Sequence, residues 1–397
     1  MSIQQKHVLA RSLVFKQLPP SLEVKQALSC LPRGRFHNIV PRGKDSLAIK
    51  FLDFRSATRF TQKFRLLPRA PLLKDATIEY EASGPLPIEI LTAIGLRNAS
   101  RVIRVSSTIA KDIPESLIDD LKKCGPIESF ESDKRKAVVN FLSIDAAIKA
   151  LDILRTSETY AGYHVYFGYD KKCDIPTPYP ADSKTDLVLT DLPKGATTNE
   201  LLRRLQSGLP DLKRETIRSI VFDEPGAKAF INFLEPVVAK IVYESFKHAK
   251  TSTGGVSVSW SWTAPSPISA SLRMAVNVGA SRTLTISHLE NVEQMRRVLK
   301  AAKMFGTVVS HSYNPSNEKT GKTVNIEFSD IFSTLRVIER IGKDMDSYPD
   351  FANTFVSFAT STDQVRPMKV VCTRTTKPET LQAQATSEPS SHPSEVS

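Results

Sequence analysis

The chain of 397 residues has few cysteines and no long apolar stretch, and each shortage excludes a class of protein. It has no run of about 18 apolar residues, which argues against a membrane-spanning helix. The first residues also lack the apolar stretch of a secretory signal. The cysteines are widely separated and form no CxxC pair, so we expect a reducing compartment, no disulfide framework and no structural zinc. They are Cys30, Cys124, Cys173 and Cys372.

Catalytic motifs are missing as well. No HExxH, GxSxG or GxGxxG occurs, and the histidines show no ligand spacing. The segment PSNEKTGKT at 315–323 ends like a phosphate-binding loop, but Ser316 stands where that loop requires glycine. We therefore expect no enzyme, no cofactor and no metal.

Positive charge is concentrated at one end of the chain. The formal net charge is +12, and residues 1–82 hold 15 Lys and Arg against 6 Asp and Glu. The later segments are nearly balanced, with 12 basic against 11 acidic residues in 99–173. A basic region on one domain indicates a polyanion partner, although a solvated basic face is the alternative.

Four segments share one order of patterns. Each opens with a β-like run, continues with an amphipathic helix pattern, and then has two β-like runs, the second ending in Phe. Another helix pattern and a final β-like run complete the unit. Apolar residues alternate in the β-like runs and recur at helical spacing elsewhere, which predicts β-α-β-β-α-β. The closing residues Phe51, Phe141, Phe233 and Phe328 are expected in the core.

The predicted fold class is therefore α+β, with four ferredoxin-like sandwiches of an antiparallel sheet and two helices. We place the units at 10–82, 99–172, 185–263 and 282–361, joined by linkers at 83–98, 173–184 and 264–281. The middle linker is rich in Pro and is expected to be an extended spacer. Residues 366–397 are polar and are expected to form a disordered tail. Segments 85–101 and 265–282 resemble each other, so the two pairs of units look like copies of one block.

The order of elements resembles the RNA recognition motif. The chain from about 10 to 362 is similar to a fungal family of four-motif proteins named for negative regulators of differentiation. The similarity rests on Ala-Ser-Arg before units two and four, and on GPIESF, VVNFLSIDAAIKAL, GYDKKC, AFINFLEPVVA and SWTAPSPISASLRMAVNVGASR. It implies a cytoplasmic, or also nuclear, mRNA-binding regulator of sexual differentiation or a stress response.

Bases stack on sheet-face aromatic rings in this motif. The first-strand position holds Val14, Arg104, Val188 and Thr285 in the four units. The third-strand positions hold Ser46 and Ala48, Lys136 and Val138, Lys228 and Phe230, and Thr323 and Asn325. Of twelve expected rings only Phe230 remains, so binding through stacking is expected to be weak.

Charged and polar residues supply the other candidate contacts with RNA. In unit one we expect cations on the outer face and in loops, and in unit two Arg104 and Lys136 on adjacent strands. In unit three we expect Phe230 to be exposed between Lys228 and Asn232, with Trp262 nearby; Trp260 either packs or covers a base. The full set is Lys16, Arg33, Arg35, Arg42, Lys44, Lys50, Arg104, Lys136, Lys228, Phe230, Asn232 and Trp262.

Two functions remain open on the sequence. The first is a single-stranded RNA-binding regulator with charge-dominated contacts. The second is a protein-interaction scaffold whose units have lost RNA stacking, with unit four and the linkers as the contact surfaces, because Glu327 on unit four should repel phosphate. Thr177-Pro178 and Ser266-Pro267 also fit proline-directed kinase sites in the linkers.

Overall fold

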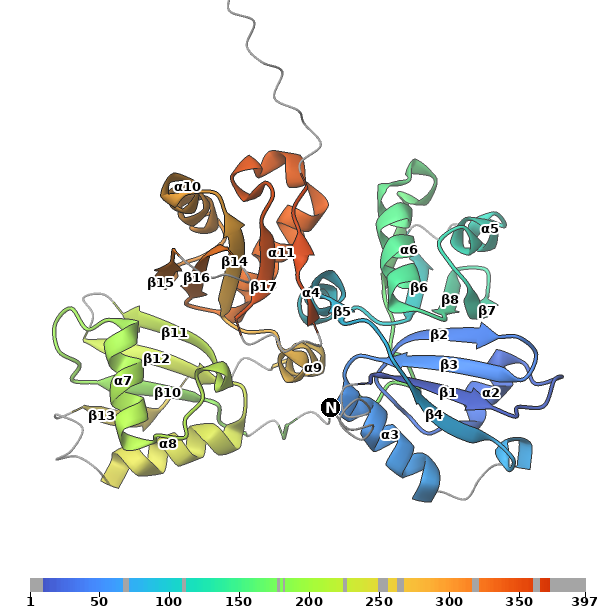
Figure 1. Cartoon of the computed structure of the whole chain (residues 1–397), viewed down its shortest axis with the longest axis horizontal. Coiled ribbons are helices and arrows are strands. Elements are labelled where there is room, and N and C mark those ends of the chain that lie inside the picture. The colour runs from blue at the N-terminus through green and yellow to red at the C-terminus, as the bar shows by residue number, and fades with distance from the viewer. Residues whose placement is uncertain are drawn as a thin grey trace, which may run out of the picture.

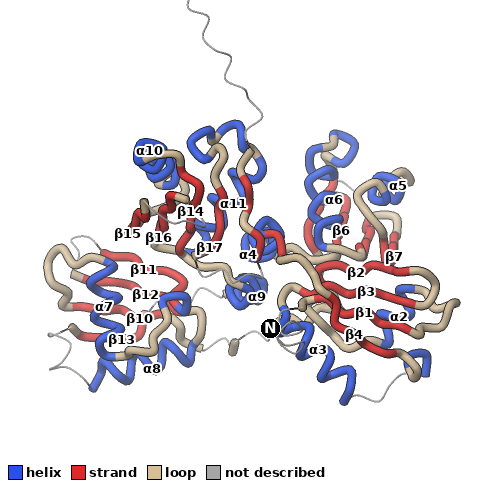
Figure 2. The backbone as a smooth tube through the Cα atoms, viewed as in Figure 1, coloured by secondary structure: helices blue, strands red, loops and turns tan. Residues whose placement is uncertain are grey.

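The structure is a computed structural model in which four small α+β units form two pairs. It describes residues 10–66, 71–108, 112–176, 179–180, 183–223, 227–248, 256–262, 268–315, 321–359 and 365–371. Figure 1 shows units one and two on the right and units three and four on the left, and Figure 2 marks the helices and strands along the same trace. No helix in the described segments is long and apolar enough to cross a membrane.

Units one and two have the predicted order of elements. In unit one they are β1 (Ser12–Lys16), α2 (Val24–Cys30), β2 (Phe36–Arg42), β3 (Ser46–Phe51), α3 (Phe54–Leu66) and β4 (Thr77–Glu81). In unit two they are β6 (Val102–Ser107), α5 (Leu117–Lys122), β7 (Ile127–Ser132), β8 (Lys136–Phe141), α6 (Ile144–Thr156) and β9 (Tyr163–Phe167).

Units three and four repeat that order. In unit three the elements are β10 (Asp186–Thr190), α7 (Thr198–Gly208), β11 (Ile217–Asp223), β12 (Lys228–Phe233), α8 (Pro236–His248) and β13 (Ser257–Trp260). In unit four they are β14 (Thr283–Leu289), α10 (Val292–Ala302), β15 (Val308–Asn314), β16 (Lys322–Phe328), α11 (Ile331–Lys343) and β17 (Phe355–Phe358).

Each unit is an antiparallel sheet in the order second, third, first and fourth strand, covered on one face by its two helices. The predicted ferredoxin-like fold is therefore confirmed. Alternation along the strands decides which face is covered, because successive side chains point to opposite sides. The four closing phenylalanines all lie on the helix side and are fully buried, as predicted.

The two units of each pair meet in the same way. The edge strand of the odd unit lies beside the start of the second helix in the even unit. The Ile39 amide donates to the Leu142 carbonyl at 2.9 Å, and the Ile220 amide donates to the Ser329 carbonyl at 2.9 Å. Because Ile39 and Ile220 occupy corresponding positions in β2 and β11, one junction is used twice.

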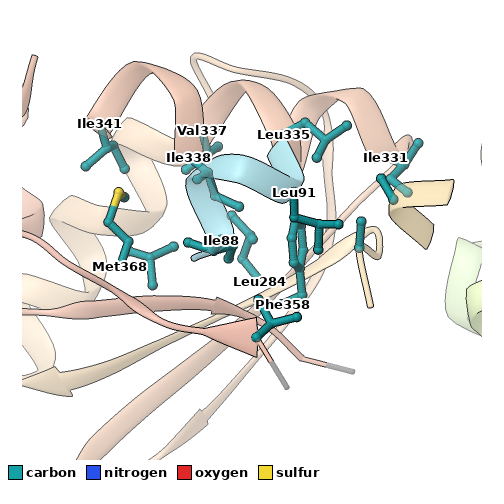
Figure 3. Packing of buried hydrophobic residues seen from close by; sticks show 14 of the residues in the cluster. Ile88, Leu91, Leu284, Ile331, Leu335, Val337, Ile338, Ile341, Phe358 and Met368 are labelled. Carbon is teal, nitrogen blue, oxygen red and sulfur yellow. The ribbon is translucent and has the colours of Figure 1, made fainter. Parts of the chain in front are cut away.

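The first linker is a helix within the core of unit four. Residues 83–98 form β5 (Leu86–Pro87) and α4 (Ile88–Arg97) instead of an open connection. Figure 3 shows Ile88 and Leu91 of α4 packed with Leu335 and Ile338 of α11 and with Phe358 of β17. At the other end of α4, the Arg97 guanidinium lies 2.7 Å from Asp152 of α6 and 3.4 Å from Glu339 of α11. The segment that precedes unit two thus joins units two and four.

The third linker mirrors the first. It forms α9 (Ala270–Val278), which packs against α4. Met274 of α9 lines a cavity of about 230 Å³ with Leu52 of unit one and Ile144 of unit two. Each linker helix therefore contacts the opposite pair, which explains the similarity of segments 85–101 and 265–282. The apolar middle of each segment is the buried face of its helix.

The predicted boundary of the disordered tail is wrong for residues 366–371. Val365–Arg366 forms β18, which pairs in parallel with β5, and Met368–Lys369 forms β19, which pairs with β17. Met368 and Val370 are buried in the core of unit four. These apolar side chains outweigh the polar composition that follows them. The rest of the predicted tail, 372–397, lies outside the described residues, as do Thr177-Pro178 and Ser266-Pro267.

Candidate nucleic-acid interface

The strand register places the predicted ring positions together on the open face of each sheet. Val14 pairs with Ala48 in unit one, and Arg104 pairs with Val138 in unit two. Val188 pairs with Phe230 in unit three, and Thr285 pairs with Asn325 in unit four. The four faces therefore share one backbone and differ in what their central pair can bind.

The open face of unit one is closed by its own ion pairs. Arg42 on β2 reaches Glu81 on β4 across the sheet, and Lys16 lies 2.6 Å from Glu79. Beneath them Ala48 is fully buried and Val14 is 8% exposed. The predicted contacts Lys16 and Arg42 are thus neutralised within the unit. Lys50 is half-buried on this face, and Lys44 is exposed in the β2–β3 hairpin.

The loop arginines of unit one lie elsewhere. Arg33 and Arg35 precede β2 at the junction with unit two and do not join Lys16 and Lys50 on the sheet. The Arg35 Nε donates to the Asp174 carbonyl at 3.2 Å, so this arginine holds the start of the middle linker. Arg33 is exposed and forms no ion pair within the described segments. The expectation that Arg33 and Arg35 lie beside Lys16 and Lys50 is therefore wrong, because the loop and sheet charges of unit one are separated.

Unit two has an open face with exposed cations, and Glu131 lies in the same row as Arg104. Arg104 in the centre of β6 is exposed and pairs in register with Tyr166 of β9. Lys136 on β8 is also exposed, in the same row as Ser106 and His164. In the described part of the chain, Arg104 and Lys136 form no ion pair. This face combines exposed positive charge with two rings.

The two rings of unit two are side by side. The His164 and Tyr166 ring centroids are 4.9 Å apart with an interplanar angle of 32°. Gly168 makes space for the Arg104 side chain, because a Cβ there would lie 3.0 Å from the Arg104 Nε. An Arg beside a ring can stack on a base and pair with phosphate at once, and rings on the fourth strand can cover a base. The arrangement can therefore hold an extended single strand without rings at the usual positions.

Unit three retains the one predicted ring but surrounds it with carboxylates. Phe230 is half-buried between Val188 and Val221, and its neighbour Lys228 is exposed. The Asn232 amide, predicted to read a base edge, donates to the Ser219 Oγ at 2.8 Å and ties β12 to β11.

Acidic groups lie in the same rows of unit three. Asp186 pairs with Asn232, and Asp223 pairs with Lys228. Burial raises the pKa of Asp186, partly offset by its hydrogen bond with Thr185. The face of unit three therefore carries carboxylates beside both its lysine and its asparagine.

The two tryptophans have different surroundings. Trp260 faces the helices and stacks on Tyr243 at 4.8 Å between centroids, so it packs. Trp262 follows the strand and is 100% exposed. Trp262 is thus free to contact a ligand, but it lies beyond the sheet.

The face of unit four is polar and partly closed. The Thr285 Oγ1 donates to Asn325 Oδ1 at 2.7 Å. Glu327, predicted to repel phosphate, is buried, and its carboxylate lies 2.9 Å from Arg282 and 3.5 Å from Arg214 of unit three. Glu327 therefore serves the junction between units three and four.

The repeated Ala-Ser-Arg motif supplies a buried arginine at each junction. Arg101 is 2% exposed, and its guanidinium donates to Asp170, Glu128 and the Phe141 carbonyl. Burial opposes the charge of Arg101, but Asp170 and Glu128 outweigh it and raise the pKa of the guanidinium. Arg282 bonds Glu327 and the Phe328 carbonyl in the same way. The motif is structural.

Comparison with known proteins gives distant relatives. No family model matches the chain. The "Meiotically up-regulated gene 24 protein" of Schizosaccharomyces pombe is 22% identical over 331 residues, which cover 76% of this chain and 50% of that protein. The chain thus matches about half the length of this curated relative.

Solved structures with several RNA-binding domains are also similar. The N-terminal three RNA-binding domains of the yeast splicing factor Prp24 share 14% identity, covering 66% of this chain and 99% of that chain, with a TM-score of 0.17. Sex-lethal RNA recognition domains 1 and 2 from Drosophila melanogaster share 16% identity over 41% of this chain and 100% of that chain, with a TM-score of 0.23. Superpositions at these TM-scores do not bear on function.

Two groups of side chains on the open faces lie outside the predicted contact set. His164 and Tyr166 had no place in the predicted set, although their alternation with buried Val165 indicates the open face. The half-buried Phe355 ring of unit four lies against His288 at 4.7 Å, with Lys369 of β19 at 6.0 Å. Lys369 could not be found from the sequence pattern, because its segment was assigned to the tail.

Proposed function

We propose that the chain is a single-stranded RNA-binding regulator whose main base-contacting surface is the open face of unit two. One observation carries the proposal: Arg104 is exposed in the centre of that sheet, beside Tyr166 and His164, and makes no ion pair with any described residue. Unit one has closed its face with ion pairs, and unit three has carboxylates beside its ring.

The chemistry follows from the side chains on that face. Tyr166 and His164 supply faces for stacking, which is worth about 1–3 kcal/mol per base. Arg104 and Lys136 supply charge for the phosphates, and the Arg guanidinium can in addition stack on a base. Such contacts tolerate many sequences, because every base has a stacking face.

The biological role is proposed on the distant relative and on the resemblance to the differentiation regulators. The Schizosaccharomyces pombe protein is named for up-regulation in meiosis. We propose that this chain acts after transcription on mRNA, in the cytoplasm or also in the nucleus, in sexual differentiation or a stress response. Crosslinking in living cells, followed by sequencing of the bound RNA, tests this role.

The binding site is tested by paired variants of the full chain. Arg104→Ala with Tyr166→Ala should weaken binding to a labelled uridine oligonucleotide by about 1–3 kcal/mol or more. Thr285→Ala with Ser357→Ala, at the corresponding register positions of unit four, is the matched control and should change the Kd little. Equal Kd values for the two variants contradict the proposal.

A protein scaffold is the second candidate, favoured by a groove between α4, α6 and α11. The groove encloses about 270 Å³ and is lined by apolar residues such as Ile90, Ile148 and Ile338, with Lys149 and Lys343 among its charged residues. It joins units two and four, so a partner seated there would hold both. If the chain fails to bind RNA at low salt, this candidate replaces the first.

A further inference from the structure

The positive charge of unit one lies largely on its helix side. The exposed residues Arg55, Arg59 and Lys63 of α3 follow one another at intervals of four. Side chains at this spacing share one face of a helix, with a rise of about 6 Å between them. Arg65 adds a fourth cation, and the helix FRSATRFTQKFRL contains no Asp or Glu. The row faces away from the sheet, since Ala57, Phe60 and Phe64 are its buried face.

The helix dipole favours Lys63 and Arg65 in the last turn of α3, but helix stability does not account for Arg55 and Arg59. Like charges at i and i+4 destabilise a helix, and a cation in the first turn opposes the helix dipole. Arg55 is in the first turn and is followed by Arg59 and Lys63 on the same face. The corresponding helices of the other units have mixed charge, as in Asp145, Lys149 and Asp152 of α6. The arrangement on α3 therefore has an energetic cost within the unit.

The row continues into a recess at the junction with unit two. Arg33 and Arg35 from the loop before β2 line this recess together with Arg59 and Lys63 of α3. The one carboxylate there belongs to Asp174, which lies 2.8 Å from the Lys63 ammonium. Arg33, Arg55 and Arg59 form no ion pair within the described segments, so their charge is available to a ligand.

We propose that Arg33, Arg55, Arg59 and Arg65, the α3 basic surface, bind the phosphate backbone of RNA at a site separate from the open face of unit two. This inference rests on the proposed function, because it takes RNA as the ligand. All four cations are arginines, whose planar fork matches phosphate geometry. An RNA strand that contacts both surfaces gains affinity from charge on unit one and from stacking on unit two.

The test uses the full chain and two matched double variants. Arg55→Gln with Arg59→Gln removes two exposed cations from α3. Arg336→Gln with Arg340→Gln removes two exposed arginines of the same spacing from α11, the corresponding helix of unit four. Binding of a uridine oligonucleotide is measured from 50 to 500 mM salt. A third variant, Arg55→Lys with Arg59→Lys, retains the charge.

The α3 variant should lower the slope of log K against log salt by about 1.4, for two phosphate contacts of about 0.7 each. Its affinity at 0.1 M salt should fall by roughly tenfold or more. The α11 variant should match the wild type, and the lysine variant should keep the wild-type slope. An α3 variant with the wild-type slope overturns the proposal.

Other outcomes separate this inference from the proposed function. If the wild type does not bind RNA even at low salt, the proposed function fails and this inference with it. If Arg104→Ala weakens binding and the α3 variant does not, only the inference fails. Vesicles of phosphatidylserine and phosphatidylcholine are the second ligand. An α3 variant that loses vesicle binding but keeps RNA binding assigns the surface to membranes and overturns the proposal.

Discussion

The two junctions of the molecule share a backbone contact and differ in the charges buried around it. The amides of Ile39 and Ile220 donate to the even unit at the same distance, 2.9 Å. At the first junction, Arg101 is enclosed by Asp170 and Glu128. At the second, Arg282 has the single carboxylate of Glu327, shared with Arg214.

The comparison shows which features both pairs of units retain because the assembly of each pair depends on them. The edge-strand contact and the buried arginine set how two units sit together, so both pairs retain them. The central positions of the open faces have diverged: Arg104 of unit two corresponds to Thr285 of unit four. A repeated fold can thus keep its assembly while its units acquire different surfaces.

The largest expected effect comes from the buried arginines. Arg101→Met should lower the free energy of unfolding by about 3–5 kcal/mol, because it leaves two buried carboxylates without a cation. Arg282→Met should cost less, because Glu327 retains Arg214 and the hydroxyl of Ser310. Urea unfolding followed by circular dichroism measures both. Equal losses would show that the second carboxylate at the first junction has no role.

The contact between the two pairs should tolerate little change at Gly95. A Cβ at this position of α4 would lie 3.1 Å from the Ala275 Cβ of α9 and 3.1 Å from the Leu335 Cδ1 of α11. Gly95→Leu should therefore cost about 1–3 kcal/mol through overpacking and separate the pairs. Small-angle scattering should show a larger radius of gyration. Gly84→Leu, where nothing lies within 4 Å, is the control and should leave the radius unchanged.

The surviving ring of unit three should matter less for RNA than the rings of unit two. Phe230→Ala should weaken RNA binding by less than the 1–3 kcal/mol typical of a stacked base, because the ring is half-buried and carboxylates lie beside it. Part of its effect should instead be lower thermal stability. A loss of RNA affinity greater than that of Tyr166→Ala would move the main site to unit three.

The smallest expected effect is on the pH dependence of stability, through one pair of side chains at the first junction. Asp145 Oδ2 lies 2.7 Å from His37 Nε2; burial raises the pKa of Asp145, but the hydrogen bond with His37 outweighs it and the net shift is downward. The resulting stability is present above the ordinary value of 3.8 and is lost as the pH falls through the lower, folded value. In Asp145→Asn, the urea concentration at the unfolding midpoint should therefore fall less between pH 5 and pH 3 than in the wild type. The same fall in both proteins would contradict this.

The fold could be predicted because alternation and helical spacing agree along every unit. The linker helices could not be placed, since the apolar faces of α4 and α9 show that they are buried but not against which unit. The candidate RNA contacts were harder to predict from the sequence than the linker helices. Arg104 and Lys136 followed from strand register, but Glu79 and Glu81, which neutralise Lys16 and Arg42, come from a strand distant in sequence.

Photocrosslinking of a uridine oligonucleotide to the full chain, with mapping of the modified peptides, tests the central claim most directly. The account predicts crosslinks on β9 of unit two, at Tyr166 or His164, because those rings lie beside the exposed Arg104. Addition of unlabelled poly(U) should abolish them. Crosslinks found only outside unit two, with none on β9, would contradict the claim that the open face of unit two is the main base-contacting surface.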